Sequence, residues 1–271
     1  MAFSPLAGVW FLVGASPDLR TQIMATPELW PSPESPGRSP IFGVFLTSSD
    51  VDAVMGLLHL REFQSFFVFA TPIVQSILRN ENSIFRVLER AERPVEWQGL
   101  LPNRRVGCHL SHELGAPPTF FYTAIPLGTN YPEYASDDSR KPGRPSDHAS
   151  VGFLIEQQNK KLFVAPSLSG HNREWTRQVV SADVVLLDGT FWSDEELVAT
   201  GRTKKLAREI GHLPLSGPDG LLAQYPKDAR ARKILIHVNN TNPILDEDSQ
   251  EHHAVVEAGF EIAYDGLTLE L

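Results

Sequence analysis

Short apolar runs that alternate with helical segments are the feature of this sequence that most restricts its fold. Apolar, β-branched and aromatic residues cluster between turn formers and predict strands at residues 9–13, 41–46, 66–70, 119–125, 151–156, 161–165, 183–187, 233–238 and 260–263. Helices are predicted between several of them, at residues 53–61, 73–78, 174–180, 203–210 and 252–258, with a further helix capped by Ser16 and opened by Pro17. This alternation indicates an α/β architecture. Because no repeat or linker interrupts it, we predict a single domain over residues 1–271.

The composition argues against several classes of partner. The 271 residues carry a formal net charge of −9, with a sequence pI near 5.5, so we expect no binding to nucleic acid or to an anionic membrane surface. No apolar run approaches the roughly 20 residues that a membrane-spanning helix needs. The single cysteine, Cys108, lies in a predicted loop as an inert thiol and excludes both an intrachain disulfide and a multi-cysteine zinc site. We predict a cytoplasmic protein.

Residues that can ligate a metal ion follow or end three of the predicted strands. They are Asp50 and Asp52, Asp188, and His237, and two further candidates are His148, just before a strand, and His212, just after a helix-ending glycine. Because the carboxyl ends of parallel strands lie at one edge of an α/β sheet, these side chains are expected to converge. Carboxylate and imidazole ligands without thiolate suit zinc, iron or manganese.

Each candidate also has a purely structural interpretation. Asp52 would cap a helix, Asp188 would begin a turn with Gly189 and Thr190, and His212 would face a helix C-terminus. His237 would be a core histidine bonded to a nearby carbonyl, since an imidazole at the end of a buried strand is costly without a partner. For each residue alone the structural interpretation is the more common one. The shared chemistry of several strand ends favours a metal or catalytic site.

Several motifs of the chain are specific enough to indicate a family. They are VLLDGTFW at residues 185–192, GHL at 211–213, IHVNNTNPILDED at 236–248, YDG at 264–266, ASPDLR at 15–20, GLL at 56–58 and LRE at 60–62. The Asn-Asn-Thr-Asn-Pro run at residues 239–243 is the most distinctive of them. On these motifs the chain resembles the PqqB family, the coenzyme PQQ synthesis proteins B, over nearly its whole length.

The resemblance implies a metallo-β-lactamase-like αββα sandwich that is N-terminally truncated, because the family's first strand, glycine-rich turn and cysteine-rich segment have no counterpart. It also implies that one metal-ligating histidine is replaced by Ala53, next to Asp52. Asp52, Asp188 and His237 then remain as the best ligands of an iron or zinc ion, with Asp50, His148 and His212 as helpers. The loop at residues 239–242 would order these ligands as a second layer of contacts.

For function, the resemblance implies a role in the biosynthesis of pyrroloquinoline quinone (PQQ). Two versions remain open: iron-dependent hydroxylation of the tyrosine of a peptide-derived precursor, or carriage and transport of PQQ or its precursor. The expected partners are that precursor or precursor peptide and other proteins of the PQQ pathway. A catalytically decayed binding protein is a further alternative, motivated by Ala53. A metallo-β-lactamase-fold hydrolase is disfavoured because the chain lacks the histidine-rich hydrolase motif.

Overall fold

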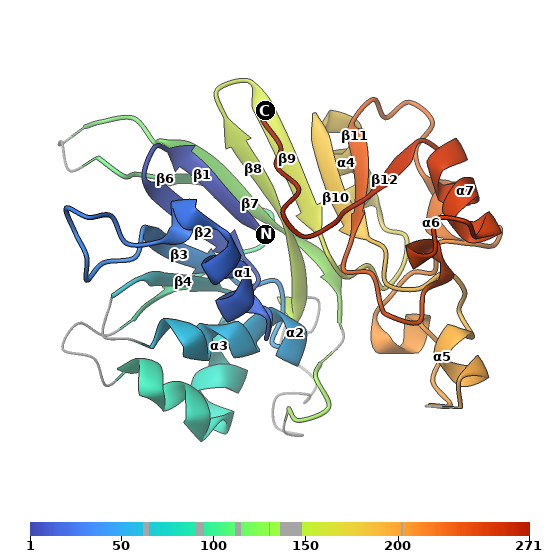
Figure 1. The fold of residues 1–271 in the computed structure, drawn as a ribbon, viewed down its shortest axis with the longest axis horizontal. Coiled ribbons are helices and arrows are strands. Elements are labelled where there is room, and N and C mark those ends of the chain that lie inside the picture. The colour runs from blue at the N-terminus through green and yellow to red at the C-terminus, as the bar shows by residue number, and fades with distance from the viewer. Residues whose placement is uncertain (62–64, 90–94, 112–114, 130, 136–147, 202) are drawn as a thin grey trace. The chain divides into compact units, whose positions relative to one another are not determined.

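The computed structural model describes residues 1–61, 65–89, 95–111, 115–129, 131–135, 148–201 and 203–271. The chain divides into two compact units (Figure 1). The first comprises Met1–Pro102, His109–Thr119 and Tyr131–Ala149, and the second comprises Asn103–Cys108, Phe120–Asn130 and Ser150–Leu271. Among the described residues, no helix is long and apolar enough to cross a bilayer. A single domain over residues 1–271 stays a prediction.

The first unit contains a five-stranded sheet with the strand order β1-β2-β3-β4-β5. Strands β2 to β5 are parallel to their neighbours, and β1 pairs with β2 antiparallel. The elements of this unit are β1 (Ala2–Leu6), β2 (Val9–Val13), α1 (Leu19–Ala25), η1 (Pro27–Leu29), β3 (Ile41–Phe45), α2 (Val51–Val54), η2 (Met55–Leu60), β4 (Phe67–Ala70), α3 (Pro72–Ser76), η3 (Ile77–Glu81), η4 (Ser83–Glu89) and β5 (Glu96–Gly99).

The two faces of this first sheet carry different kinds of apolar residue. Leu12, Val44 and Val68 belong to one buried cluster with residues of α1, α2 and α3, and Figure 1 shows these helices together beside the sheet. Their neighbours on the opposite face are aromatic: the rings of Phe45 and Phe69 stack with centroids 4.4 Å apart. Both faces are therefore apolar, which explains why the central strands read as continuous apolar runs rather than as alternating ones.

The second unit contains a seven-stranded mixed sheet with the order β12-β11-β10-β9-β8-β7-β6. Strands β9 to β12 are parallel, and β6 to β9 are antiparallel. The elements are β6 (Arg105–Cys108), β7 (Phe120–Gly128), β8 (Ser150–Gln157), β9 (Lys160–Ala165), α4 (Arg173–Ser181), β10 (Val184–Asp188), α5 (Glu196–Ala199), η6 (Arg208–Ile210), α6 (Leu221–Gln224), β11 (Arg232–Ile236), η7 (Pro243–Leu245), α7 (Gln250–Glu257) and β12 (Phe260–Ile262).

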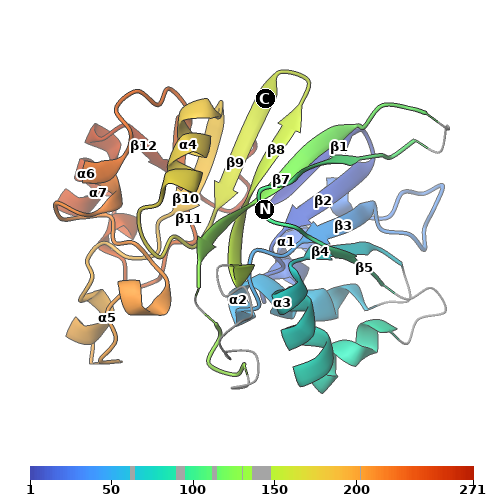
Figure 2. The ribbon, with the colours of Figure 1, turned by 180° about the vertical axis from the view of Figure 1, so that it is seen from behind.

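One buried cluster holds the helices of the second unit against its parallel strands. It joins Val185, Leu187 and Leu235 of β10 and β11 to Trp175 of α4 and Val255 of α7. Figure 2, seen from behind, shows α4 in front of β10, with α6 and α7 beside β12. The packing fixes the parallel strands in register, so that their carboxyl ends share one edge of the sheet.

The predicted strands and the hairpin of β8 and β9 are confirmed, whereas several boundaries are wrong. Helix α1 begins at Leu19 with Asp18 as its N-cap, not at Pro17 behind Ser16. The helix predicted at residues 203–210 is reduced to the single 3₁₀ turn η6, which Gly211 ends in a left-handed conformation (φ 98°). Strands β1, β5 and β6 and the short α6 are additions to the predicted elements. Each has only four or five residues and lacks a clear apolar period.

Cys108 is the last residue of β6 rather than part of a loop, and it is buried. Burial raises the pKa of its thiol to about 12. Because the thiolate is the reactive form of cysteine, the structure supports the prediction of an inert thiol.

Candidate metal centre

The carboxyl edge of the parallel strands in the second unit gathers the strongest candidate residues. In β10 and β11, Asp188 pairs with Ile236, so that Asp188 and His237 come from neighbouring strand ends. Gly189 allows the two ends to approach closely: a Cβ at this position would lie 2.9 Å from Cβ of Leu235 and 3.1 Å from the carbonyl oxygen of Ile236. The amide of Gly189 donates to that carbonyl at 2.8 Å, which holds the two strand ends together.

Asp188 is completely buried, and both of its carboxylate oxygens accept hydrogen bonds. Oδ1 accepts from the backbone amide of Thr190 at 3.1 Å and from its hydroxyl at 2.6 Å. Oδ2 accepts from the amide of Leu168 at 2.8 Å and lies 2.9 Å from Nδ1 of His212.

Burial by itself would raise the pKa of the Asp188 carboxyl. The charges and hydrogen bonds of His212, His237 and Thr190 outweigh burial, so that this pKa lies below its ordinary value. Asp188 is therefore a buried carboxylate that stays ionised at neutral pH.

His212 reaches Asp188 from the turn that follows η6. Its backbone amide donates to the carbonyl of Ala207 at 3.0 Å, and its ring meets that of Phe191 edge-on, with centroids 5.6 Å apart. The ring also stacks on that of His237, with centroids 5.4 Å apart and planes 15° from parallel. The backbone and ring contacts together set the orientation of the imidazole.

His237 directly follows β11 and has a left-handed backbone conformation, with φ of 60°. This conformation is uncommon for a residue other than glycine and is frequent at functional sites. Its Nδ1 lies 2.8 Å from the hydroxyl of Thr190, and its side chain is exposed, in contrast to the buried Asp188. The left-handed turn places the ring beside the strand end rather than in the core.

Asn242 supports the turn that follows Asp188. Its side chain, 2% exposed, donates to the carbonyls of Gly189 and Thr190 at 2.9 and 3.2 Å and accepts from the amide of Ile244. The amide of Asn239 also donates to the carbonyl of Thr190, at 3.2 Å. Contacts from Asn239 and Asn242 thus hold the turn at Gly189 and Thr190. That residues 239–242 order metal ligands stays a prediction.

Two residues of this arrangement are not among the sequence candidates: Thr190 and Leu168. Thr190 stands two positions after an acidic strand end, which is the spacing at which Asp side chains accept from the following backbone. That spacing is a usable signal. Leu168 contributes only its backbone amide, which no sequence pattern reveals.

The three side chains meet a geometric requirement for binding a metal ion. Asp188, His212 and His237 each offer one ligand atom, and these atoms all lie within 4.8 Å of one another. In the described part of the chain they are the one group of at least three His, Cys, Asp or Glu residues with this property. Two imidazoles and one carboxylate fit a zinc or iron ion and leave coordination positions for water or substrate.

Asp50, Asp52 and His148 belong to the first unit. Asp50 is the N-cap residue of α2, and its Oδ2 accepts from the hydroxyl of Ser48 at 2.8 Å. Asp52 lies exposed in the first turn of α2, and the carbonyl of His148 accepts from the hydroxyl of Thr71 at 2.8 Å. A ligand role for these three residues stays a prediction.

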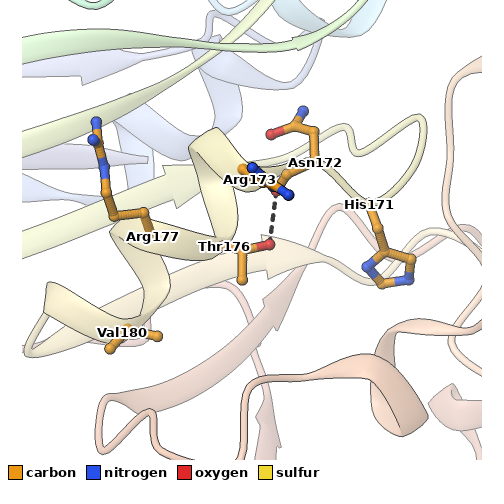
Figure 3. A pocket seen from close by; sticks show the side chains of 6 residues that line it. All are labelled: His171, Asn172, Arg173, Thr176, Arg177 and Val180. Carbon is orange, nitrogen blue, oxygen red and sulfur yellow. Dashed lines mark hydrogen bonds between the residues drawn. The ribbon is translucent and has the colours of Figure 1, made fainter.

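An open hollow on α4 provides no alternative centre of this kind. Figure 3 shows the six side chains that line it, with the hydroxyl of Thr176 donating to the backbone carbonyl of Asn172. The lining contains one imidazole, that of His171, and two exposed arginines, Arg173 and Arg177. Cationic side chains repel a metal ion, so this surface does not resemble the cluster around Asp188.

Comparison with known proteins connects this geometry to a family. Residues 9–238 match the family model of the Beta-lactamase superfamily domain. The chain is 36% identical over 268 residues to the coenzyme PQQ synthesis protein B of Pseudomonas protegens, and 38% identical over 270 residues to that of Pseudomonas paraeruginosa. Each alignment covers 97% of this chain and 84% of the relative.

A solved structure agrees with the sequence comparison. The crystal structure of Zn(2+)-bound PqqB from Methylobacterium extorquens superposes with a TM-score of 0.86 at 34% sequence identity, covering 100% of this chain and 86% of that chain. The predicted metallo-β-lactamase fold is thereby confirmed. On sequence and structure together, this chain belongs to the PqqB family of coenzyme PQQ synthesis proteins.

Proposed function

We propose that this PqqB-like protein binds a divalent metal ion through Asp188, His212 and His237, and that the ion serves hydroxylation of the tyrosine of a peptide-derived PQQ precursor. The observation that carries the proposal is the convergence of these three ligand atoms within 4.8 Å at one edge of the sheet. Two histidines and one carboxylate form the ligand set of non-haem iron(II) oxygenases. The zinc bound by the Methylobacterium extorquens relative supports a divalent ion in this fold.

The three proposed ligands differ in burial, and each has a different role in the site. Asp188, with no exposed surface, supplies the fixed negative charge that a cation requires, because the surrounding donors keep it ionised. His212 is half-buried, and its ring lies between Phe191 and His237. His237 is exposed, so a substrate approaches the centre past its ring.

The ion, when bound, supplies the activation of dioxygen that hydroxylation requires. The protein's own residues hold the ligands and position the precursor. His237 is exposed, so we expect a tyrosine of a peptide-derived molecule to approach the site on this side.

The test is reconstitution of metal-free protein with Fe²⁺ under anaerobic conditions and with Zn²⁺ in air, followed by removal of unbound metal and elemental analysis. We expect about one ion per chain in the wild type and strongly reduced retention in Asp188→Ala and His237→Ala. His171→Ala is the matched control, because His171 is an exposed histidine of the same unit that lies on the α4 hollow. Oxygen-dependent conversion of the precursor by the iron-loaded wild type then tests the reaction.

A wild type that retains no metal would contradict the proposal, and so would an Asp188→Ala variant that retains as much metal as a metal-binding wild type. Retention of metal without conversion of the precursor would contradict hydroxylation and leave the metal site standing.

Carriage of PQQ or its precursor is the second candidate. It is supported by Ala53, which stands where the family resemblance implies a ligating histidine. A carrier is expected to bind PQQ or the precursor equally well with and without metal, whereas a hydroxylase is expected to bind the precursor more tightly when iron is present. Calorimetric titration of metal-free and iron-loaded protein with each compound separates the two. Partnership with other proteins of the PQQ pathway and a cytoplasmic location stay predictions.

A further inference from the structure

The hydroxyl of Thr190 joins Asp188 to His237. Oγ1 of Thr190 lies 2.6 Å from Oδ1 of Asp188, 2.8 Å from Nδ1 of His237 and 2.9 Å from the carbonyl oxygen of His237. Thr190 is 5% exposed, so water does not compete effectively for these contacts. One side chain thus touches a candidate ligand on each of two neighbouring strand ends.

The single proton of this hydroxyl decides how the contacts are used. A threonine hydroxyl donates one hydrogen bond and accepts through its lone pairs. Of the three contacts, the one with the carboxylate of Asp188 is the shortest, and this carboxylate is an ionised acceptor. Its length of 2.6 Å is typical of a charge-assisted O–H···O⁻ hydrogen bond. The carbonyl of His237, at 2.9 Å, is a longer and neutral competitor. The hydroxyl proton therefore points to Oδ1 of Asp188.

The contact with the ring of His237 must then run in the opposite direction. Since the only hydroxyl proton of Thr190 is used in the hydrogen bond to Asp188, the hydroxyl oxygen can only accept a hydrogen bond from Nδ1 of His237. That assignment places the ring proton of the neutral imidazole on Nδ1 and the lone pair on Nε2. A lone pair on Nε2 is what a metal ion needs from this ring.

The backbone keeps Thr190 at this position. Its carbonyl accepts from the amide of Asn239 and from the side chain of Asn242, both at 3.2 Å, and its amide donates to Asp188. Three contacts on the main chain leave the hydroxyl little freedom to turn away from His237. The left-handed φ of His237 brings the ring and the carbonyl of that residue to the same hydroxyl.

We infer that Thr190 is a positioning residue that fixes His237 as its Nδ1–H tautomer and so makes Nε2 the ligand atom of this ring. The tautomer concerns the metal-free protein. Its consequence for metal affinity rests on the proposed function. In many metal sites a carboxylate accepts a hydrogen bond from a ligating histidine and so orients its ring. Here the carboxylate of Asp188 acts on His237 in the same way, through the hydroxyl of Thr190 that lies between them.

The direct test is ¹⁵N NMR of the imidazoles in metal-free protein, recorded over a series of alkaline pH values, with His237→Ala identifying the signal. We expect Nδ1 of His237 to show the shift of a protonated nitrogen and Nε2 that of an unprotonated one. Thr190→Val should shift the ring toward the other tautomer, and Thr190→Ser, which keeps the hydroxyl, should restore the wild-type pattern. A wild-type spectrum with the proton on Nε2 overturns the inference, and this measurement needs no variant of Thr190 to fold.

The second test is titration of the same proteins with Zn²⁺. Thr190→Val is expected to bind zinc roughly 10- to 100-fold more weakly, whereas Thr190→Ser should stay close to the wild type. Thr176→Val is the matched control: Thr176 is a half-buried threonine of the second unit whose hydroxyl donates to the carbonyl of Asn172. It should leave both the His237 spectrum and the zinc affinity unchanged.

The two tests separate failure of the inference from failure of the proposed function. A wild type that shows the predicted tautomer but binds no zinc contradicts the proposed metal site and supports the inference. A wild type that binds zinc, with the proton on Nε2 in the metal-free state or with equal affinity in Thr190→Val, overturns the inference and leaves the metal site standing.

Discussion

Two strand ends of this protein each carry an acidic residue but make different contacts. After β3, in the first unit, the chain reads Thr-Ser-Ser-Asp at residues 47–50. Strand β10, in the second unit, ends at Asp188, which Gly189 and Thr190 follow. At the first end the hydroxyl of Ser48 donates to Asp50, and the phenol of Tyr134 donates to the carbonyl of Ser49. At the second end the ring of His212 and the hydroxyl of Thr190 contact the carboxylate of Asp188. The ring of His237 contacts that hydroxyl and stacks on the ring of His212.

The comparison shows that an acidic residue at the end of an apolar strand can have quite different partners, depending on the fold around it. At the first end the contacts come from hydroxyl groups. Burial, and to a smaller extent the negative charge of Asp50, raises the pKa of Tyr134 to about 12, so that the phenol keeps its proton and donates a hydrogen bond. At the second end, His212 and His237 come from elsewhere in the chain and bring imidazole nitrogens close to the carboxylate, as the proposed metal site requires. What differs is the set of partners that the fold brings to each strand end.

Removal of the Asp188 carboxylate should have the largest effect on the difference between the two strand ends. Asp188→Ala leaves the amides of Leu168 and Thr190 and the ring of His212 without their common acceptor. We expect the free energy of unfolding to fall by roughly 3 kcal/mol and metal binding to be lost. Ser48→Ala, the comparison variant in the first unit, should cost about 1 kcal/mol and leave metal binding intact. Urea unfolding and metal titration of both variants provide the measurements, and equal effects in the two would contradict the contrast.

The glycine of the second strand end is expected to have the next largest effect. A methyl group at Gly189 would lie 2.9 Å from Cβ of Leu235 and 3.3 Å from Cγ2 of Val238, so the ends of β10 and β11 would have to separate. We expect Gly189→Ala to lower the free energy of unfolding by roughly 2 kcal/mol and to weaken metal binding. Gly170→Ala is the matched control, because nothing lies within 4 Å of the added methyl. Its unfolding free energy should stay within about 0.5 kcal/mol of the wild type. If Gly189→Ala were as stable as the wild type, the close approach of β10 and β11 at Gly189 would not be needed for the fold.

Acid should produce the smallest and most gradual effect. The pKa of Asp188 is lower in the folded protein than the ordinary carboxyl value, so its ionised form stabilises the fold above that ordinary value. This contribution is lost as the pH falls through the lowered pKa. In metal-free protein, the difference in unfolding free energy between the wild type and Asp188→Asn should therefore narrow from neutral pH to about pH 3. A difference that is constant over this range would show that the carboxylate charge does not contribute.

Local pattern is sufficient to predict the elements that carry the site but not all of their surroundings. All five residues of β10 are buried, and its apolar run predicts this strand directly, as the polar residues after β11 predict a turn. The helix predicted at residues 203–210 is wrong, because only its last turn forms, as η6. Strand β5, with mostly exposed residues, has no apolar period to reveal it, because it is held by pairing with β4.

The sequence by itself determined the α/β class, the strand ends and the residue types of the candidate metal site, because strand periodicity and side-chain chemistry are local properties. It also carried the motifs of the PqqB family. Tertiary structure decided which candidates meet: His212 reaches Asp188 across 24 positions, and His237 reaches Thr190 across 47. The parallel register of β10 and β11 and the close approach that Gly189 permits bring His237 to Thr190, and the turn after η6 brings His212 to Asp188. Such contacts depend on packing between distant segments, which no local pattern encodes.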